Sequence, residues 1–134
     1  MELLAVDGYE NILSCDLCQK EISRLYNGHP ESHGYQKWLN RNLNTLDNSQ
    51  IGDLLHLKSF EDLTGYKNLY SIRRPESKGN PRVLFFLIVE ESEGPLYILL
   101  TAFHEHNKGD YTRGIKIAEA RKREVLKLIG KQEV

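Results

Sequence analysis

The residues best suited to chemistry lie in one short segment, which reads His104-Glu105-His106-Asn107-Lys108-Gly109-Asp110-Tyr111-Thr112-Arg113. Two histidines, two carboxylates, a lysine, a tyrosine and an arginine fall within these ten residues. Such side chains transfer protons and stabilise anions near neutral pH. The segment therefore predicts an acid–base site for an anionic substrate. The alternative is a solvated loop with ordinary surface charges.

The strands before this segment must place it at the rim of a sheet. Three stretches rich in aromatic and β-branched residues predict strands, at residues 69–74, 82–90 and 96–103. Turns are predicted at 76–81, where Gly79-Asn80 reverses the chain, and at 91–95. These connections are too short for crossovers, so the three strands are expected to form an antiparallel meander.

The meander brings two arginines to one end of the sheet. Arg73 ends the first strand and Arg82 begins the second, so the hairpin places them side by side. Arg82 could offer its forked donors to a phosphate group. After the polar segment, a final helix is predicted from Thr112, its expected N-cap, to Ile129, and Gly130 ends it.

The first half of the chain reads as helical. Gly28 and Pro30 end a first predicted helix, whose apolar stripe at steps of three and four is Ile12, Cys15, Cys18, Ile22 and Leu25. A second helix is predicted over residues 33–46. Residues 51–65 are ambiguous: they could hold a short helix around residues 52–57 and an extended approach to Gly65.

The predicted fold class is α+β, in a single domain over residues 1–134. Helices in residues 1–50 are expected to pack on one face of the small antiparallel sheet, and residues 66–134 supply the sheet and the closing helix. The other sheet face is expected to stay open, with the polar segment at its rim. That open face is where we expect the site.

Charge is balanced overall but not along the chain. The 134 residues have a net charge of −1, which by itself disfavours a uniformly basic nucleic-acid binder. Residues 1–65 contain 5 basic and 10 acidic side chains, whereas residues 66–134 contain 13 basic and 9 acidic ones. The asymmetry indicates a polyanion-facing second half, and the alternative is chance variation among solvated charges.

Two further patterns of cysteine and histidine residues could bind metal ions. Cys15 and Cys18, followed by His29 and His33, approach the spacing of a two-Cys, two-His zinc site, but the alternative is two buried thiols in an apolar stripe. His104 and His106 could likewise together bind a metal ion.

The longest apolar run has seven residues, well short of the ~20 in a membrane helix. No signal peptide is evident, and the chain is expected to be cytoplasmic.

The second half resembles a known family. Four segments match its pattern in order and spacing: Leu69-Tyr70-Ser71-Ile72-Arg73, Arg82-Val83-Leu84-Phe85-Phe86, Tyr97-Ile98-Leu99-Leu100-Thr101-Ala102-Phe103, and the helix Ile115-x-Ile117-Ala118-x-x-Arg121. Together they resemble the RelE/ParE toxin superfamily, and within it the phage-derived, HigB-like branch. The resemblance covers about residues 57–124.

This resemblance implies a RelE-like fold and a toxin of a type II toxin–antitoxin system. It implies a hydrolase, an RNA-binding endoribonuclease that cuts mRNA, commonly on the ribosome, with a cognate antitoxin protein as a second partner. The implied mechanism needs no metal or cofactor: the 2′-hydroxyl attacks the adjacent phosphate and leaves a cyclic phosphate and a 5′-hydroxyl.

The resemblance also implies site residues. Arg73 and Arg82 match the family's strand arginines, and the catalytic residues are expected to be these two with His104, His106 and Lys108, which lie in the segment that is usually rich in lysine. RNA binding is expected at Arg74, Tyr111 and Arg113. The family usually has lysines where this chain has histidine and glutamate, so either histidine could carry the proton. Two alternatives remain: a non-enzymatic, ParE-type toxin that inhibits a topoisomerase, and a phage or accessory binding module that has kept the fold.

Overall fold

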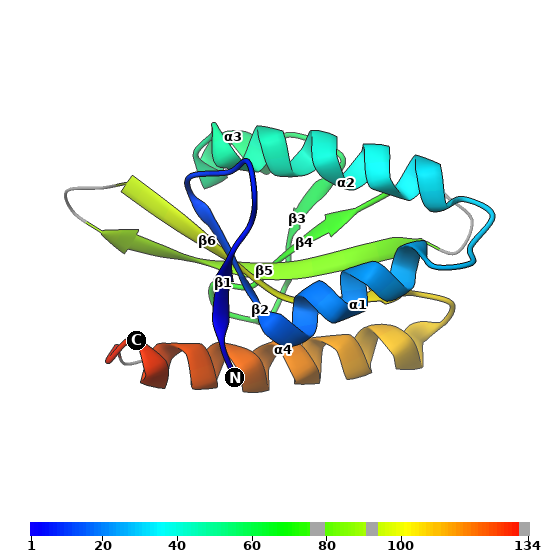
Figure 1. Ribbon diagram of the computed structural model, residues 1–134. Coiled ribbons are helices and arrows are strands. Elements are labelled where there is room, and N and C mark those ends of the chain that lie inside the picture. The colour runs from blue at the N-terminus through cyan, green and yellow to red at the C-terminus, as the bar shows by residue number, and fades with distance from the viewer. Residues whose placement is uncertain (76–79, 91–93, 132–134) are drawn as a thin grey trace.

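The computed structural model describes residues 1–75, 80–90 and 94–131. Six strands and four helices follow one another along this part of the chain (Figure 1). In chain order they are β1 (Leu3–Ala5), β2 (Ile12–Cys15), α1 (Asp16–Tyr26), α2 (Ser32–Asp47), α3 (Ile51–Leu54), β3 (Phe60–Asp62), β4 (Tyr70–Arg73), β5 (Pro81–Glu90), β6 (Gly94–His104) and α4 (Lys108–Leu128).

The strands form one mixed sheet in the order β1-β2-β6-β5-β4-β3. The predicted meander of β4, β5 and β6 is confirmed, and both of its pairings are antiparallel. The expectation of a purely antiparallel sheet is wrong, because β2 pairs with β6 in parallel. Such a pairing needs a long crossover, which α1, α2 and the following strands supply.

Helices cover both faces of this sheet. Figure 1 shows α2 and α3 on one side of the strands and α4 on the other, so the expected open face is wrong. The reason lies in β5, where neighbouring side chains point to opposite faces. Phe85 and Phe86 are consecutive and neither has exposed surface, so both faces must be covered.

The helical reading of the first half is only partly correct. Helix α2 matches its prediction, and Tyr35 and Trp38 bury its inner face. Ile12 and Cys15, however, belong to strand β2, and α1 begins only at Asp16. Spacing of three fits a helix, but pairing with β6 decides the structure here.

Helix α4 begins earlier than predicted. Its N-cap is Asn107, whose side-chain oxygen accepts a hydrogen bond from the Asp110 N–H at 3.0 Å, so Thr112 is not the N-cap. The polar segment is therefore mostly the first turns of a helix. The predicted end is confirmed, because Gly130 has a left-handed φ of 74°. The predicted turns at 76–81 and 91–95 include residues 76–79 and 91–93, which lie outside the described residues.

Candidate functional site

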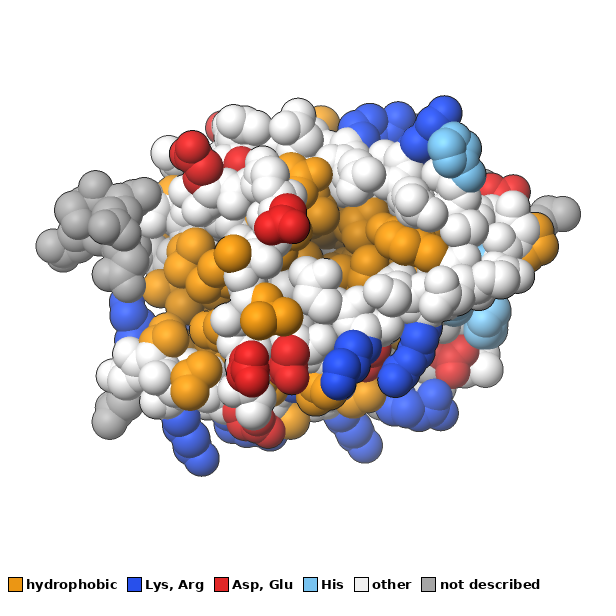
Figure 2. All heavy atoms as spheres, viewed as in Figure 1, with side chains coloured by type: hydrophobic (Ala, Val, Ile, Leu, Met, Phe, Trp, Pro, Cys, Tyr) orange, Lys and Arg blue, Asp and Glu red, His pale blue; other side chains and the backbone are white. Residues whose placement is uncertain are grey.

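Seven of the eight predicted site residues lie where β4 and β6 end and β5 and α4 begin, and Arg113 follows one turn into α4. The histidine side chains visible in Figure 2 all lie toward this end of the molecule, at the right of the view. The end contains two separate groups of side chains. We name them the histidine cluster (His29, Tyr35, Arg74, His104 and His106) and the arginine cluster (Glu61, Ser71, Arg82, Glu105 and Tyr111).

The histidine cluster is a stack of rings. The ring of His104 lies between those of His29 and His106, with centroid distances of 5.1 and 5.8 Å and interplanar angles of 16° and 20°. The buried ring of Tyr35 is 5.4 Å from His104 and 4.8 Å from His29. His106 is exposed, so the outer end of the stack is open to a ligand.

Local hydrogen bonds and one cation fix the inner end of this stack. The Glu31 N–H donates to His29 Nδ1 at 3.0 Å, so the neutral His29 ring has its proton on Nε2 and offers a donor there. The guanidinium of Arg74 lies 5.4 Å from the Tyr35 ring centroid and 3.5 Å from a Glu31 carboxylate oxygen. A cation therefore lies against Tyr35, whose ring contacts both His29 and His104.

The arginine cluster surrounds one guanidinium with acceptors. Arg82 Nε donates to Glu105 Oε2 at 2.5 Å, while Nη1 donates to Glu61 Oε1 and to Ser71 Oγ, the latter at 3.3 Å. The Tyr111 ring centroid lies 4.8 Å from the guanidinium carbon. Arg82 is only 8% exposed, so the two carboxylates neutralise a nearly buried cation.

These surroundings also set the protonation of the cluster. Burial opposes the charge of Arg82, but its bonds to Glu61 and Glu105 outweigh burial and raise its pKa. Burial and then the charge of Glu61 raise the pKa of the Tyr111 hydroxyl. Arg82 is therefore a permanent cation, and Tyr111 is a neutral phenol at physiological pH.

The sheet separates the two clusters. Arg82 pairs with Phe103, whose ring packs against Gly114 of α4, whereas His104 contacts Tyr35 of α2. Adjacent residues of a strand point to opposite faces, so His104 and Arg82 lie on opposite sides of the sheet. The structure thus brings together His104, His106 and Arg74, and separately Arg82 and Tyr111.

Arg73 lies with the arginine cluster. Its predicted pairing with Arg82 is confirmed by the strand register. Its Nε donates to the Lys58 carbonyl at 2.9 Å, and Nη1 lies 3.8 Å from a Glu61 oxygen. Arg73 therefore already has a backbone acceptor and a carboxylate beside it.

The remaining predicted residues lie at the start of α4. Arg113 and His104 line one small pocket of about 100 Å³, together with Asp110. Lys108 is exposed and lines a neighbouring surface hollow with Arg113 and Lys116. These cations extend from the histidine cluster along α4 and could contact a polyanion.

Four members of the clusters are not predicted as site residues by the sequence: His29, Tyr35, Glu61 and Ser71. His29 was assigned only to a possible zinc pattern, and Glu61 to no site. His29 joins the cluster because the α1–α2 connection passes the end of β6, and Glu61 because β3 extends the sheet beyond β4. Neither His29 nor Glu61 is a sequence neighbour of the predicted site residues, so the sequence did not indicate that either would join a cluster.

The zinc pattern does not assemble. Cys15 and Cys18 have no exposed surface, and His33 is exposed on α2. Within residues 1–75, 80–90 and 94–131, no three His, Cys, Asp or Glu side chains come close enough to hold a metal ion. The alternative of two buried thiols describes the structure.

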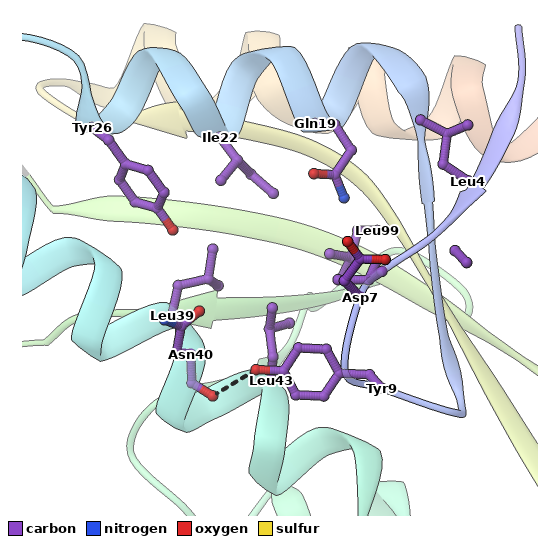
Figure 3. Close-up of a pocket in the computed structure, with 12 residues that line it drawn as sticks. Leu4, Asp7, Tyr9, Gln19, Ile22, Tyr26, Leu39, Asn40, Leu43 and Leu99 are labelled. Atoms are coloured by element: carbon purple, nitrogen blue, oxygen red, sulfur yellow. Dashed lines mark hydrogen bonds between the residues drawn. The ribbon is translucent and has the colours of Figure 1, made fainter.

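A hollow of about 450 Å³ lies between β1, α1 and α2 (Figure 3). Its walls include Ile22, Leu39 and Leu43, and the Tyr9 hydroxyl donates to the Asn40 carbonyl at 3.2 Å across one side. It contains none of the predicted site residues. The chemistry-bearing side chains lie in the two clusters instead.

Within the described part of the chain, no helix combines the length and the apolar character needed to span a bilayer.

Comparisons with known proteins add no assignment. No family model, curated protein or solved structure matches the chain.

Proposed function

We propose that this protein is the toxin of a type II toxin–antitoxin pair, related to the HigB-like branch of the RelE/ParE superfamily, and that it cleaves mRNA in the cytoplasm. The observation that supports this most directly is the histidine cluster. It combines two imidazoles at the end of a strand with a neighbouring guanidinium. Proton transfer by imidazole and charge stabilisation by arginine are what RNA cleavage without a metal requires.

The proposed step is internal transesterification. One imidazole of His104 or His106 removes the proton of a ribose 2′-hydroxyl, and the 2′-oxygen forms a bond to the adjacent phosphorus. The bond from phosphorus to the 5′-oxygen breaks, and the other imidazole gives that oxygen a proton. The products are a 2′,3′-cyclic phosphate and a 5′-hydroxyl, and Arg74, Lys108 and Arg113 balance the phosphate charge.

The four segments that resemble the family support the same proposal. They form one continuous unit of β4, β5, β6 and α4, in the expected order. Residues 66–134 also contain the basic excess of the chain, which favours an RNA partner. With this function, the protein would bind the ribosome and a cognate antitoxin.

Expression in a bacterium tests the proposal. The wild-type chain is expected to arrest growth, and His104→Gln and His106→Gln are each expected to relieve the arrest, since each removes one proton carrier. His56→Gln is the matched control, because His56 is exposed and lies outside both clusters. Arrest that persists unchanged in the His104→Gln/His106→Gln double variant would refute the catalytic role of this cluster.

One observation favours a second function, a toxin that acts by binding alone, as in the ParE-type alternative. Arg82 is occupied by Glu61 and Glu105, and the sheet separates it from the histidines. A toxin that acts only by binding does not need this arginine and the histidines in one catalytic site. Inhibited DNA supercoiling with intact RNA would select this function over cleavage.

A further inference from the structure

We infer that Glu105 and Arg82 form a latch that positions the two histidines, and that Arg82 is a positioning residue and not a phosphate ligand. This inference rests on the proposed function for the reaction that the histidines perform. The latch itself is a structural claim that can be tested without RNA.

The first argument comes from the order of residues at the end of β6. Glu105 lies between His104 and His106 in the chain. In extended backbone, side chains alternate between faces. Anchoring Glu105 on the α4 face therefore turns both neighbouring imidazoles to the α2 face, where they stack 5.8 Å apart.

The second argument is the number of contacts that hold Glu105. Its carboxylate accepts from Arg82 Nε at 2.5 Å and from Asn80 Nδ2 at 2.9 Å. Its backbone N–H donates to the Asn80 carbonyl at 3.1 Å, which extends the pairing of β5 with β6 past His104. Both the side chain and the backbone of Glu105 are thus fixed.

The third argument is that Arg82 has little left to offer a phosphate. It is 8% exposed, binds two carboxylates and has the Tyr111 ring beside it. A phosphate would have to displace Glu61 or Glu105 from a nearly buried guanidinium and would then lie close to the displaced carboxylate, which is unfavourable. Arg74, Lys108 and Arg113 are more exposed than Arg82. Arg74 contacts Tyr35 of the histidine cluster and Arg113 lines a pocket with His104, so these cations suit the anion better.

Two variants separate positioning from general stability. Glu105→Ala and Glu61→Ala each remove one carboxylate from Arg82, but only Glu105 adjoins the histidines. In ¹H–¹⁵N spectra of the imidazoles, Glu105→Ala is expected to shift the His104 and His106 signals, whereas Glu61→Ala leaves them in place. Glu105→Gln, which keeps an acceptor oxygen, is expected to retain the wild-type signals, and it is examined in the same way if Glu105→Ala does not fold.

Inorganic phosphate tests the other half of the inference. Titrated into the wild-type protein, it is expected to perturb the His106 ring signals and to leave the Arg82 Nε–H signal unchanged. A shifted Arg82 signal, or equal effects of Glu105→Ala and Glu61→Ala on the histidines, would overturn the latch.

Cleavage assays then show whether the proposed function holds. If RNA is cut, Glu105→Ala is expected to lower kcat by about 100-fold with little change in KM, because a misplaced acid–base pair slows chemistry more than binding. If RNA is not cut, the proposed function fails while the spectra still decide on the latch.

Discussion

Cys15 and Cys18 illustrate how burial controls reactivity at the scale of a residue. Burial raises the pKa of Cys15 from 9.0 to about 11, and burial also raises the pKa of Cys18. The thiolate is the reactive form, so a rise of two units lowers its population near pH 8 about 100-fold. Both thiols are therefore expected to react with Ellman's reagent far more slowly in the native protein than after unfolding.

The matched measurement uses the same protein in strong denaturant, where both thiols should be titrated within the mixing time. Native protein is expected to react slowly, at a rate that increases with pH because more thiolate forms. Native thiols that react as fast as the denatured ones would show that the two cysteines are not buried in solution.

The partners of Arg82 show what the sequence could not predict about a site residue. Its position beside Arg73 follows from the hairpin and was predictable from the two strands. Its partners were not, because Glu61 reaches it from β3 and Glu105 from beyond β6. A nearly buried arginine with two carboxylate partners is chemically different from an exposed arginine without them.

At the scale of elements, the start of α4 is fixed by two hydrogen bonds of Asp110, one from its N–H and one to its carboxylate. Asn107 accepts from the Asp110 N–H, and the Asp110 carboxylate accepts from the His106 N–H at 3.0 Å. The bond from His106 is the main cause that lowers the pKa of Asp110. This pair joins the helix to the strand end that bears the histidines.

Asp110 should therefore make stability depend on pH. Because its folded pKa is depressed, its contribution is present above the unfolded pKa of about 4 and is lost as pH falls through the folded pKa. Asp110→Asn is expected to lower the urea midpoint at pH 7, with the difference from wild type disappearing toward pH 2.

Asp62→Asn is the matched control for that series, because Asp62 is exposed at the end of β3. It should change the midpoint little at either pH. If the effect of Asp110→Asn were as large at pH 2 as at pH 7, the stabilising role of the ionised carboxylate would be contradicted.

Elements with a strong local pattern were predictable, and the short strands outside the meander were not. Helix α2, strands β4 to β6 and most of α4 follow from strong periodicity or β-branched runs. Strands β1, β2 and β3 have three or four residues each, and they exist because neighbours in the sheet pair with them. Local sequence contains too little signal for such strands.

At the scale of the whole molecule, one carboxylate joins three elements. Glu21 of α1 accepts from the Thr101 hydroxyl at 2.9 Å and from the Ala102 N–H at 3.3 Å on β6. Its two oxygens also accept from Arg121 of α4 at 2.6 and 3.2 Å. The contact satisfies the edge of β6 beyond the end of β2 and holds α4 against it.

Glu21→Ala is expected to destabilise the protein by about 3 kcal/mol in urea unfolding, because it leaves Arg121 without its carboxylate in a largely buried place. Glu124→Ala, at an exposed position on α4, is the control and should have little effect. A double-mutant cycle with Arg121→Ala should be strongly non-additive. Additive effects would mean that the two side chains do not interact in solution.

At the scale of the whole molecule, the positions of the charged residues also change how the net charge is interpreted. Arg113 of α4 lines a pocket with His104, and Lys108 and Lys116 line the hollow beside it, whereas residues 1–65 contain the acidic excess of the chain. A net charge of −1 is therefore compatible with RNA contact at one end of the molecule.

The most direct test of the central claim is the analysis of RNA ends after incubation with the purified protein and translating ribosomes. We predict fragments with a 2′,3′-cyclic phosphate and a 5′-hydroxyl, no cut where the nucleotide 5′ to the scissile phosphate is 2′-deoxy, and loss of cleavage in His104→Gln/His106→Gln. Intact RNA with the wild-type protein, or equal cleavage by the double variant, would contradict the account.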